Sequence, residues 1–193
     1  MRKVAPEDHF VLTSNADGMF EQNGFDTGKI YTAQGDYSRF QCLSRCTEQV
    51  WPARPFIDRA LPQIDPLTME IADPDAIPMC PNCGGQVVMN VRGGGWFIET
   101  PHMESAKRFQ EFVARSRGRK LVILEIGAGF NTPSVVRFRC EAIAKQNPSS
   151  KFIRINATHP ELTTVDLGSR AALLACDALH AIEGFSSQVF SAV

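Results

Sequence analysis

Two close pairs of cysteines are the strongest chemical signal in the chain. Cys42 and Cys46 are separated by three residues, and Cys80 and Cys83 by two. In a reducing compartment, close-spaced pairs favour metal over disulfide. Each pair can hold a metal ion from a tight turn, and four thiolates complete the closed tetrahedron of a structural zinc site. The sequence therefore predicts one structural zinc ion, and four ordinary reduced cysteines are the alternative.

A second group of polar residues follows a short apolar run near the N-terminus. Residues 10–13 read Phe-Val-Leu-Thr, which predicts a buried strand, and Ser14, Asn15 and Asp17 follow in a loop. Ligands of open α/β sheets bind outside the carboxyl ends of the strands, where such side chains would lie. A loop closed by its own Asn and Asp side chains is the alternative.

A third group follows the most apolar segment of the chain. Residues 121–126 predict a buried strand, and Gly127-Ala128-Gly129 comes directly after it. Glycines allow a ligand to approach the backbone closely, and a helix that starts nearby offers N–H groups to a phosphate. Thr132 and Pro133 predict the N-cap and the first residue of such a helix, which would end near Lys145.

The elements that must position these residues alternate in the second half of the chain. The apolar patterns predict helices at 104–117 and 178–182, and strands at 121–126, 151–155 and 171–174. This alternation is typical of an α/β fold with a parallel sheet. Residues 40–91 contain many prolines and all four paired cysteines, which indicates a small module held by something other than its own core.

Composition argues against two classes of partner. The 193 residues carry a net charge of −1 and 44% of them are hydrophobic. This ordinary globular balance points neither to nucleic acid nor to a membrane surface. The longest apolar runs are too short to span a bilayer, and we find no secretory signal behind Met1. We therefore expect a cytoplasmic protein.

Taken together, these segments resemble the sirtuin family. Thr13 to Met19 is similar to the sirtuin signature Thr-Gln-Asn-x-Asp-x-Leu. Two cysteine pairs, a Gly-x-Gly turn after a strand and an Ile155-Asn156 strand end follow in the order found in sirtuins. The resemblance covers essentially the whole chain. It implies a sirtuin-like, Rossmann-type parallel sheet formed by residues 1–39 and 102–193, a zinc-binding domain inserted at 40–101, and NAD as the cofactor beside zinc.

The resemblance also implies a role for each candidate residue. Asn15 and Asp17 would face the nicotinamide and its ribose, and Asn156 would bind the adenosine ribose. The full set implied to contact NAD is Ser14, Asn15, Asp17, Gly127, Ala128, Gly129, Asn131, Asn156 and Asp177. A simple turn residue is the alternative for Asn156, and a helix cap is the alternative for Asp177.

One departure from the family bears on the reaction. Deacylating sirtuins carry a catalytic histidine, and Gln34 occupies that position here. An amide cannot act as a general base near neutral pH, although it can orient a ribose hydroxyl or a water. The segments 33–37, 90–97 and 127–133 resemble a divergent, macrodomain-linked branch of the sirtuins, whose members transfer single ADP-ribose units to proteins.

This branch implies an NAD-dependent protein mono-ADP-ribosyltransferase. Asn15, Asp17 and Gln34 would be its catalytic residues, because fixed polar groups can stabilise the positive charge that develops on the ribose. The residues implied to contact the acceptor are Arg92, Trp96 and Phe97, and a solvated surface arginine is the alternative for Arg92. The implied partners are a protein acceptor, with lipoyl-carrier proteins known as acceptors in the branch, and a macrodomain hydrolase.

One sirtuin segment has no match before Phe10: the strand and Gly-Ala-Gly-x-Ser turn that bind the pyrophosphate. We therefore expect a Rossmann-type sheet that lacks its first strand. Two other interpretations stay open. One is a non-catalytic, zinc-stabilised binding module, and the other is an NAD-dependent deacylase, which Gln34 disfavours.

Overall fold

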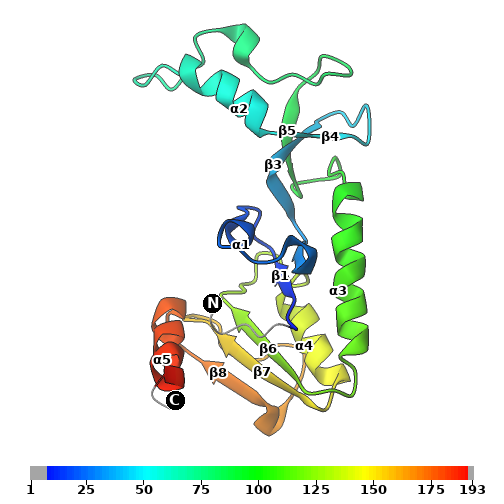
Figure 1. Cartoon of the computed structure of the whole chain (residues 1–193), viewed down its shortest axis with the longest axis vertical. Helices are drawn as coiled ribbons and strands as arrows, with labels where there is room; N and C mark the ends of the chain where they lie inside the picture. The colour runs from blue at the N-terminus through cyan, green and yellow to red at the C-terminus, as the bar shows by residue number, and fades with distance from the viewer. Residues whose placement is uncertain (1–7, 191–193) are drawn as a thin grey trace. The chain divides into compact units, whose positions relative to one another are not determined.

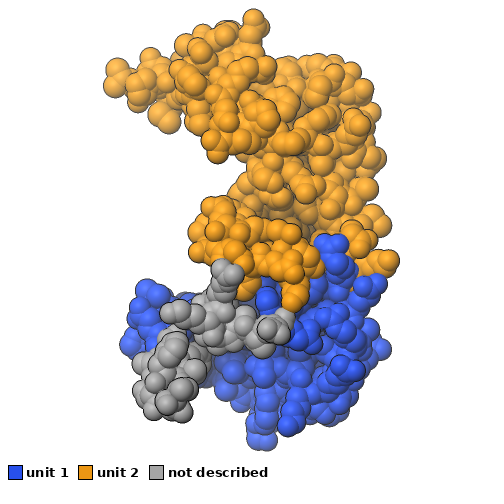
Figure 2. Space-filling model, in the orientation of Figure 1, with its two compact units in different colours: residues 1–12, 108–193 blue, residues 13–107 orange. Residues whose placement is uncertain are grey.

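The computed structural model describes residues 8–190 (Figure 1). The chain divides into two compact units, which Figure 2 colours separately. The first unit comprises residues 1–12 and 108–193, and the second comprises residues 13–107. These divisions do not coincide with the domain boundaries expected at 39/40 and 101/102, which stay a prediction.

The first unit contains a three-stranded parallel sheet in the order β6-β7-β8 (Figure 1). The strands are β6 (Leu121–Ile126), β7 (Ser150–Ile155) and β8 (Ala171–Leu174). Helix α4 (Arg137–Gln146) connects β6 to β7, the short 3-10 helix η5 (Gly168–Arg170) leads into β8, and α5 (Ala178–Phe190) follows it. The predicted α/β fold with a parallel sheet is confirmed, and the finer sirtuin-like arrangement stays a prediction.

The core of the first unit contains an apolar cluster and a charged cluster that share the same face of the sheet. Phe152 of β7, Ala144 of α4 and Leu167 are buried together, and Ile123 and Cys140 pack against them. A second buried cluster consists of four charged side chains, which are at most 2% exposed: Glu125, Arg137, Glu141 and Arg154. Buried charges are stable only when they are paired and hydrogen-bonded.

Three of the four buried charges, Glu125, Glu141 and Arg154, form a connected network. Glu125 and Arg154 are register partners on β6 and β7, and Arg154 donates to both oxygens of Glu125 at 2.5 and 3.0 Å. Arg154 also lies 2.9 Å from Glu141 of α4. The Glu141 carboxylate accepts from the backbone N–H groups of Thr163 and Thr164. These contacts therefore join β6, β7, α4 and the loop that contains Thr163 and Thr164.

Helix α4 starts later than the sequence predicts. We expected Thr132 as the N-cap and Pro133 as the first helical residue, but α4 begins at Arg137 with Val136 at its N-cap. Residues 133–136 form a turn, with Val135 N–H donating to the Thr132 carbonyl. The buried side chain of Arg137 reaches back to the carbonyl of Ala128. The β-branched Val135 and Val136 have low helix propensity, so this tertiary contact decides where the helix starts.

The second unit is built around an antiparallel sheet in the order β4-β3-β5. Its strands are β3 (Gly35–Cys42), β4 (Val50–Pro52) and β5 (Val87–Val91). A two-stranded sheet pairs β1 (Val11–Thr13) with β2 (Ile30–Thr32). The helices are α1 (Met19–Gln22), η1 (Thr27–Lys29), α2 (Arg54–Ala60), η2 (Leu61–Gln63), η3 (Pro74–Ala76) and η4 (Thr100–His102). Helix α3 (Met103–Arg115) begins in the second unit and continues into the first.

Several predicted elements of this part are confirmed. A strand ends at Thr13, short elements fill residues 40–91, and α3 lies where the helix at 104–117 was expected. Within residues 8–190, none of the helices has both the length and the apolar character needed to cross a bilayer.

Gly35 holds the turn between β2 and β3 against β5. Its φ is +98°, and a Cβ at this position would lie 2.1 Å from the Asn90 carbonyl oxygen. An alanine here would combine left-handed backbone strain with a backbone clash.

We therefore expect Gly35→Ala to lower the free energy of unfolding by about 3 kcal/mol, the sum of roughly 1–2 for strain and 1–3 for overpacking. Gly84 is the matched control, because its φ is +70° and its Cβ would meet nothing within 4 Å. Gly84→Ala should lower the free energy by only about 1 kcal/mol. Chemical denaturation of the two variants measures both values, and equal losses would contradict the clash.

Candidate functional site

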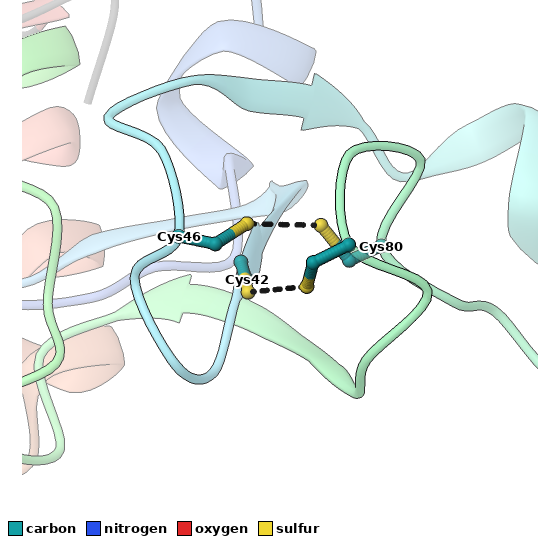
Figure 3. Close-up of side chains that lie close together, drawn as sticks. Cys42, Cys46 and Cys80 are labelled. Atoms are coloured by element: carbon teal, nitrogen blue, oxygen red, sulfur yellow. Dashed lines mark hydrogen bonds between the residues drawn. The ribbon is translucent and has the colours of Figure 1, made fainter.

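The four paired cysteines converge on one point in the second unit (Figure 3). Cys42 is the last residue of β3, and Cys46 follows after a turn in which Arg45 has a φ of +49°. Cys80 and Cys83 lie on a tight turn before β5, closed by the Gly84 N–H donating to the Cys80 carbonyl. Each pair therefore sits on a compact loop, as the spacing predicted.

The sulfur positions fit a tetrahedral metal. All four Sγ atoms lie within 4.8 Å of one another, with Cys42 and Cys83 3.7 Å apart and Cys46 and Cys80 3.6 Å apart. Thiolates bound to zinc at about 2.3 Å in a tetrahedron are roughly 3.8 Å apart. Cys42 and Cys80 are buried, while Cys46 and Cys83 are exposed. The residues present can hold one structural zinc ion.

Electrostatics within the cluster also favour a cation. The pKa of Cys42 falls to about 7, chiefly because the backbone N–H of Cys46 donates to its sulfur. The pKa of Cys46 rises to about 12: a hydrogen bond from Asn82 lowers it, but burial and the neighbouring thiols outweigh that bond. Four thiolates at this distance repel one another, and a divalent metal removes that repulsion.

Two segments that carry the predicted catalytic residues lie side by side in the second unit. The Ala33 N–H donates to the Thr13 carbonyl at 3.0 Å, and the Tyr37 N–H donates to the Ala16 carbonyl at 2.9 Å. The loop with Ser14, Asn15 and Asp17 is thus tied to the turn with Gln34. The side chains of the three loop residues are exposed.

Hydrogen bonds within the loop fix its shape. The Asn15 N–H donates to the Thr13 hydroxyl at 3.0 Å, and Asp17 Oδ1 accepts from the Met19 N–H at 3.1 Å. One carboxylate oxygen of Asp17 therefore binds the first N–H of helix α1, whose N-cap is Gly18. The Asp17 contact is a local turn of the kind that the sequence offered as the alternative, whereas Asn15 contributes its backbone N–H to the turn. The roles of both residues toward NAD stay predictions.

Gln34 carries an unsatisfied acceptor. Its Oε1 atom is buried and has no hydrogen-bond partner among the described residues. A buried acceptor without a partner is destabilising by about 1–3 kcal/mol, and such groups point to a missing donor. The backbone of Gln34 is held, because its carbonyl accepts from the Arg92 N–H at 2.9 Å.

The three predicted acceptor-binding residues lie on or beside a glycine-rich loop that follows β5. Arg92 pairs with Glu99 at 2.6 Å, and its guanidinium lies 4.4 Å from the centre of the Phe97 ring. Trp96 is 37% exposed, while Phe97 is only 6% exposed. Phe97 therefore supports the loop, and Trp96 and Arg92 are the side chains at its surface.

A buried network of polar side chains locks this loop, and sequence reasoning missed it. Gln41 Nε2 donates to the Trp96 carbonyl at 2.6 Å, and Gln41 Oε1 accepts from the Ile98 N–H and from Asn90 Nδ2. Asn90 Oδ1 can only accept, so His102 Nε2, 2.8 Å away, is the donor. Polar residues on strand faces that otherwise point inward, Gln41 in β3 and Asn90 in β5, were the available signal.

In the first unit the Gly127-Ala128-Gly129 turn lies at the carboxyl end of β6. Gly127 has a φ of +68°, and a Cβ on Gly127 or Gly129 would meet nothing within 4 Å. The Ala128 carbonyl accepts from Asn156 Nδ2 at 3.0 Å. The backbone of the turn is therefore open to a ligand, as expected for these glycines, and Asn131 beyond it is exposed.

Two predicted NAD contacts already have structural roles. Asn156 is 7% exposed, and its Oδ1 accepts from the backbone N–H groups of Thr158 and His159. Asp177 Oδ1 accepts from the N–H groups of Leu179 and His180 at the start of α5. Both therefore match the structural alternatives, a turn residue and a helix cap, and their contacts to NAD stay predictions.

The chain is similar in sequence to proteins that are named ADP-ribosyltransferases. It is 39% identical over 153 residues to a "Probable bifunctional ADP-ribose hydrolase/ADP-ribosyltransferase" of Fusarium oxysporum f. sp. cubense, which covers 77% of this chain and 26% of that protein. It is 24% identical over 161 residues to a "Protein ADP-ribosyltransferase" of Staphylococcus aureus, covering 79% of this chain and 48% of that protein. No protein-family model matches the chain.

The chain thus spans about a quarter of the length of the first relative and about half of the second. Both names agree with the expected reaction class, ADP-ribosyl transfer. Neither name mentions NAD or sirtuins.

The zinc site is tested by metal content. Purified protein should hold about one zinc per chain, and Cys83→Ser should lower that content and loosen the module while the parallel sheet of the first unit stays folded. Cys176→Ser, outside the cluster, is the control and should keep its zinc. Elemental analysis and circular dichroism measure these outcomes, and a metal-free chain with an intact module would rule out the site.

His102 makes the stability of the second unit sensitive to acid. Burial, followed by the charge of Arg39, lowers its pKa below the ordinary 6.5. The folded state thus resists protonation while the unfolded state takes up a proton below pH 6.5, so stability falls as pH drops through this range, by at most about 1.4 kcal/mol per pH unit.

His102→Gln keeps an N–H donor and removes the titration, so it should flatten the decline in unfolding free energy between pH 6.5 and 5. The exposed His180→Gln should leave the decline unchanged. Denaturant titrations across this pH range compare the two variants, and identical slopes would refute the assignment to His102.

Proposed function

We propose that this chain acts as an NAD-dependent protein mono-ADP-ribosyltransferase of the sirtuin type, which transfers ADP-ribose to a protein acceptor and releases nicotinamide. The observation that carries the proposal is the similarity to two proteins named ADP-ribosyltransferases over more than three quarters of the chain. A match of that extent draws on both compact units. The proposal is supported further by the chemistry of the residues in each unit.

In the second unit, Gln34 fits a ligand that donates a hydrogen bond. Its buried Oε1 has no partner among the described residues, and a ribose hydroxyl is such a donor. Asn15 and Asp17, on the adjacent loop, offer an exposed amide and carboxylate. In the first unit, Gly127 and Gly129 leave open space over the backbone, which suits a dinucleotide.

The residues present favour a reaction that needs no strong enzymic base. When bound, NAD supplies an ADP-ribosyl group whose bond to nicotinamide breaks with positive charge developing on the ribose. Asp17 and the side-chain oxygens of Asn15 and Gln34 can stabilise that charge without moving a proton. An acceptor carboxylate is ionised at neutral pH, so its oxygen forms the new bond to the ribose carbon as the bond to nicotinamide breaks.

The acceptor would bind at the loop after β5. Trp96 offers an exposed aromatic surface and Arg92 a cation, although Glu99 already neutralises part of that charge. A lipoyl-carrier protein is the acceptor to test first, by analogy with the sirtuin branch that the chain resembles. A macrodomain hydrolase that reverses the modification is the expected partner, and the bifunctional name of the Fusarium relative supports this pairing.

The function is tested with labelled NAD. Incubation with cell extract and with purified lipoyl-carrier protein should label a protein band, and Gly129→Val should abolish labelling by placing a branched side chain where the dinucleotide approaches. Gly184→Val is the matched control, because its Cβ also meets nothing within 4 Å. Asn15→Ala should lower the rate of transfer more than the affinity for NAD measured by calorimetry.

The same preparation should not deacetylate an acetyl-lysine peptide, since Gln34 cannot replace a base. Robust deacetylation would support the deacylase interpretation instead. If the chain neither binds NAD nor labels a protein while both glycine variants stay folded, the binding-module interpretation is favoured.

A further inference from the structure

The Gly127-Ala128-Gly129 turn has no side chains large enough to hold it in place. Its backbone is anchored by the Gly127 N–H, which donates to the Ile155 carbonyl at 2.9 Å, and by the Ala128 carbonyl. That carbonyl accepts from Asn156 and from Arg137 Nη1, the latter at 3.1 Å. An open glycine turn that must present its backbone to a ligand depends on such anchors for a fixed shape.

Arg137 is the anchor with the widest reach. Its side chain is fully buried, and its guanidinium also donates to the His159 carbonyl at 3.0 Å, the Glu161 carbonyl at 2.6 Å and the Thr163 hydroxyl at 3.0 Å. One planar group therefore joins the glycine turn to the loop at 159–163. The ring of Phe130, two residues beyond Ala128, covers the guanidinium with its centre 4.4 Å away.

Acidic side chains, one of them exposed, balance the charge of Arg137. Glu161 lies 3.5 Å from its Nη2, and the nearby cluster of Glu125, Glu141 and Arg154 brings the buried total to two arginines and two glutamates. Arg137 is thus not available as a free cation for phosphate. Its N–H groups donate to backbone carbonyls of two loops, so the side chain holds those loops in position.

We propose that Arg137 is a positioning residue that couples the 127–131 turn and the 159–163 loop into one rigid piece, and that this coupling sets the affinity for a dinucleotide. The inference rests on the proposed function for its ligand, and on the five hydrogen bonds of one side chain for its geometry. Lysine keeps the charge but lacks the fork of donors that reaches both loops.

Hydrogen exchange tests the coupling without any ligand. In Arg137→Lys, the hydrogen-bonded amides of Gly127, His159 and Thr163 should exchange at least about tenfold faster, together, while amides in the middle of β6 and β7 keep their rates. Arg170→Lys is the matched control, because Arg170 donates to the Ala144 and Asn147 carbonyls and to Ser150, next to the start of β7. It should leave the amides of Gly127, His159 and Thr163 protected.

Thr163→Val serves if Arg137→Lys does not fold, since it removes a single acceptor of the guanidinium. It should accelerate exchange at Gly127 although Thr163 lies in the other loop. Acceleration confined to His159 and Thr163, or at none of the three amides, would overturn the coupling.

Ligand binding tests the second half of the proposal. Arg137→Lys should weaken NAD binding by about tenfold and raise KM accordingly, while kcat at saturating NAD changes less than about twofold. An unchanged Kd in a variant with two loosened loops would overturn the link to affinity. If the unsubstituted chain binds no NAD, the proposed function fails and the affinity role with it, whereas exchange still decides the coupling.

Discussion

Burial of charge is the constraint on which the first unit depends. Arg154 alone meets Glu125 across the strand register and Glu141 on α4, and Glu141 in turn accepts from the backbone of Thr163 and Thr164. Removing one partner of such a network leaves an uncompensated buried charge, which is destabilising by about 3–5 kcal/mol. The sheet, the helix and the loop beyond β7 can therefore adopt this arrangement only together. Because the glycine turn follows β6 directly, the same arrangement fixes where the turn begins.

In the second unit, the buried polar groups are neutral side chains and thiols instead of paired charges. Three of its buried polar side chains are the amides of Gln41 and Asn90 and the ring of His102, whose donors and acceptors match one another. The cysteine cluster lies directly beside this network, since Gln41 precedes Cys42 at the end of β3 and the Cys80–Cys83 turn precedes β5. A metal bound by the four cysteines would therefore fix the same end of the β3–β5 pair that the amide network holds.

The sequence predicted local features better than the tertiary contacts that use them. The strands at 121–126, 151–155 and 171–174 and the cysteine cluster were predictable, because each depends on neighbouring residues or short spacing. The start of α4 was predicted wrongly, because the local signal of Thr132-Pro133 competes with burial of the Arg137 side chain. The pairing of Glu125 with Arg154 joins residues 29 apart in sequence, and only opposite charges inside two apolar strands hinted at it.

Gln34 restricts the type of acceptor more than any other candidate residue does. Its amide cannot remove a proton, so an acceptor that must lose one, such as a serine hydroxyl or a lysine ammonium, would need a base from elsewhere. The acceptor's own carboxylate avoids that requirement, because it is a nucleophile at neutral pH without any proton transfer. Under the proposed function, the Oε1 of Gln34, which has no partner among the described residues, would hold a hydroxyl donor still while charge develops beside it. Fixed dipoles can stabilise such a charge. The Gln34 amide is suited to this role because the neighbouring Gly35 packs closely against β5 and holds the turn.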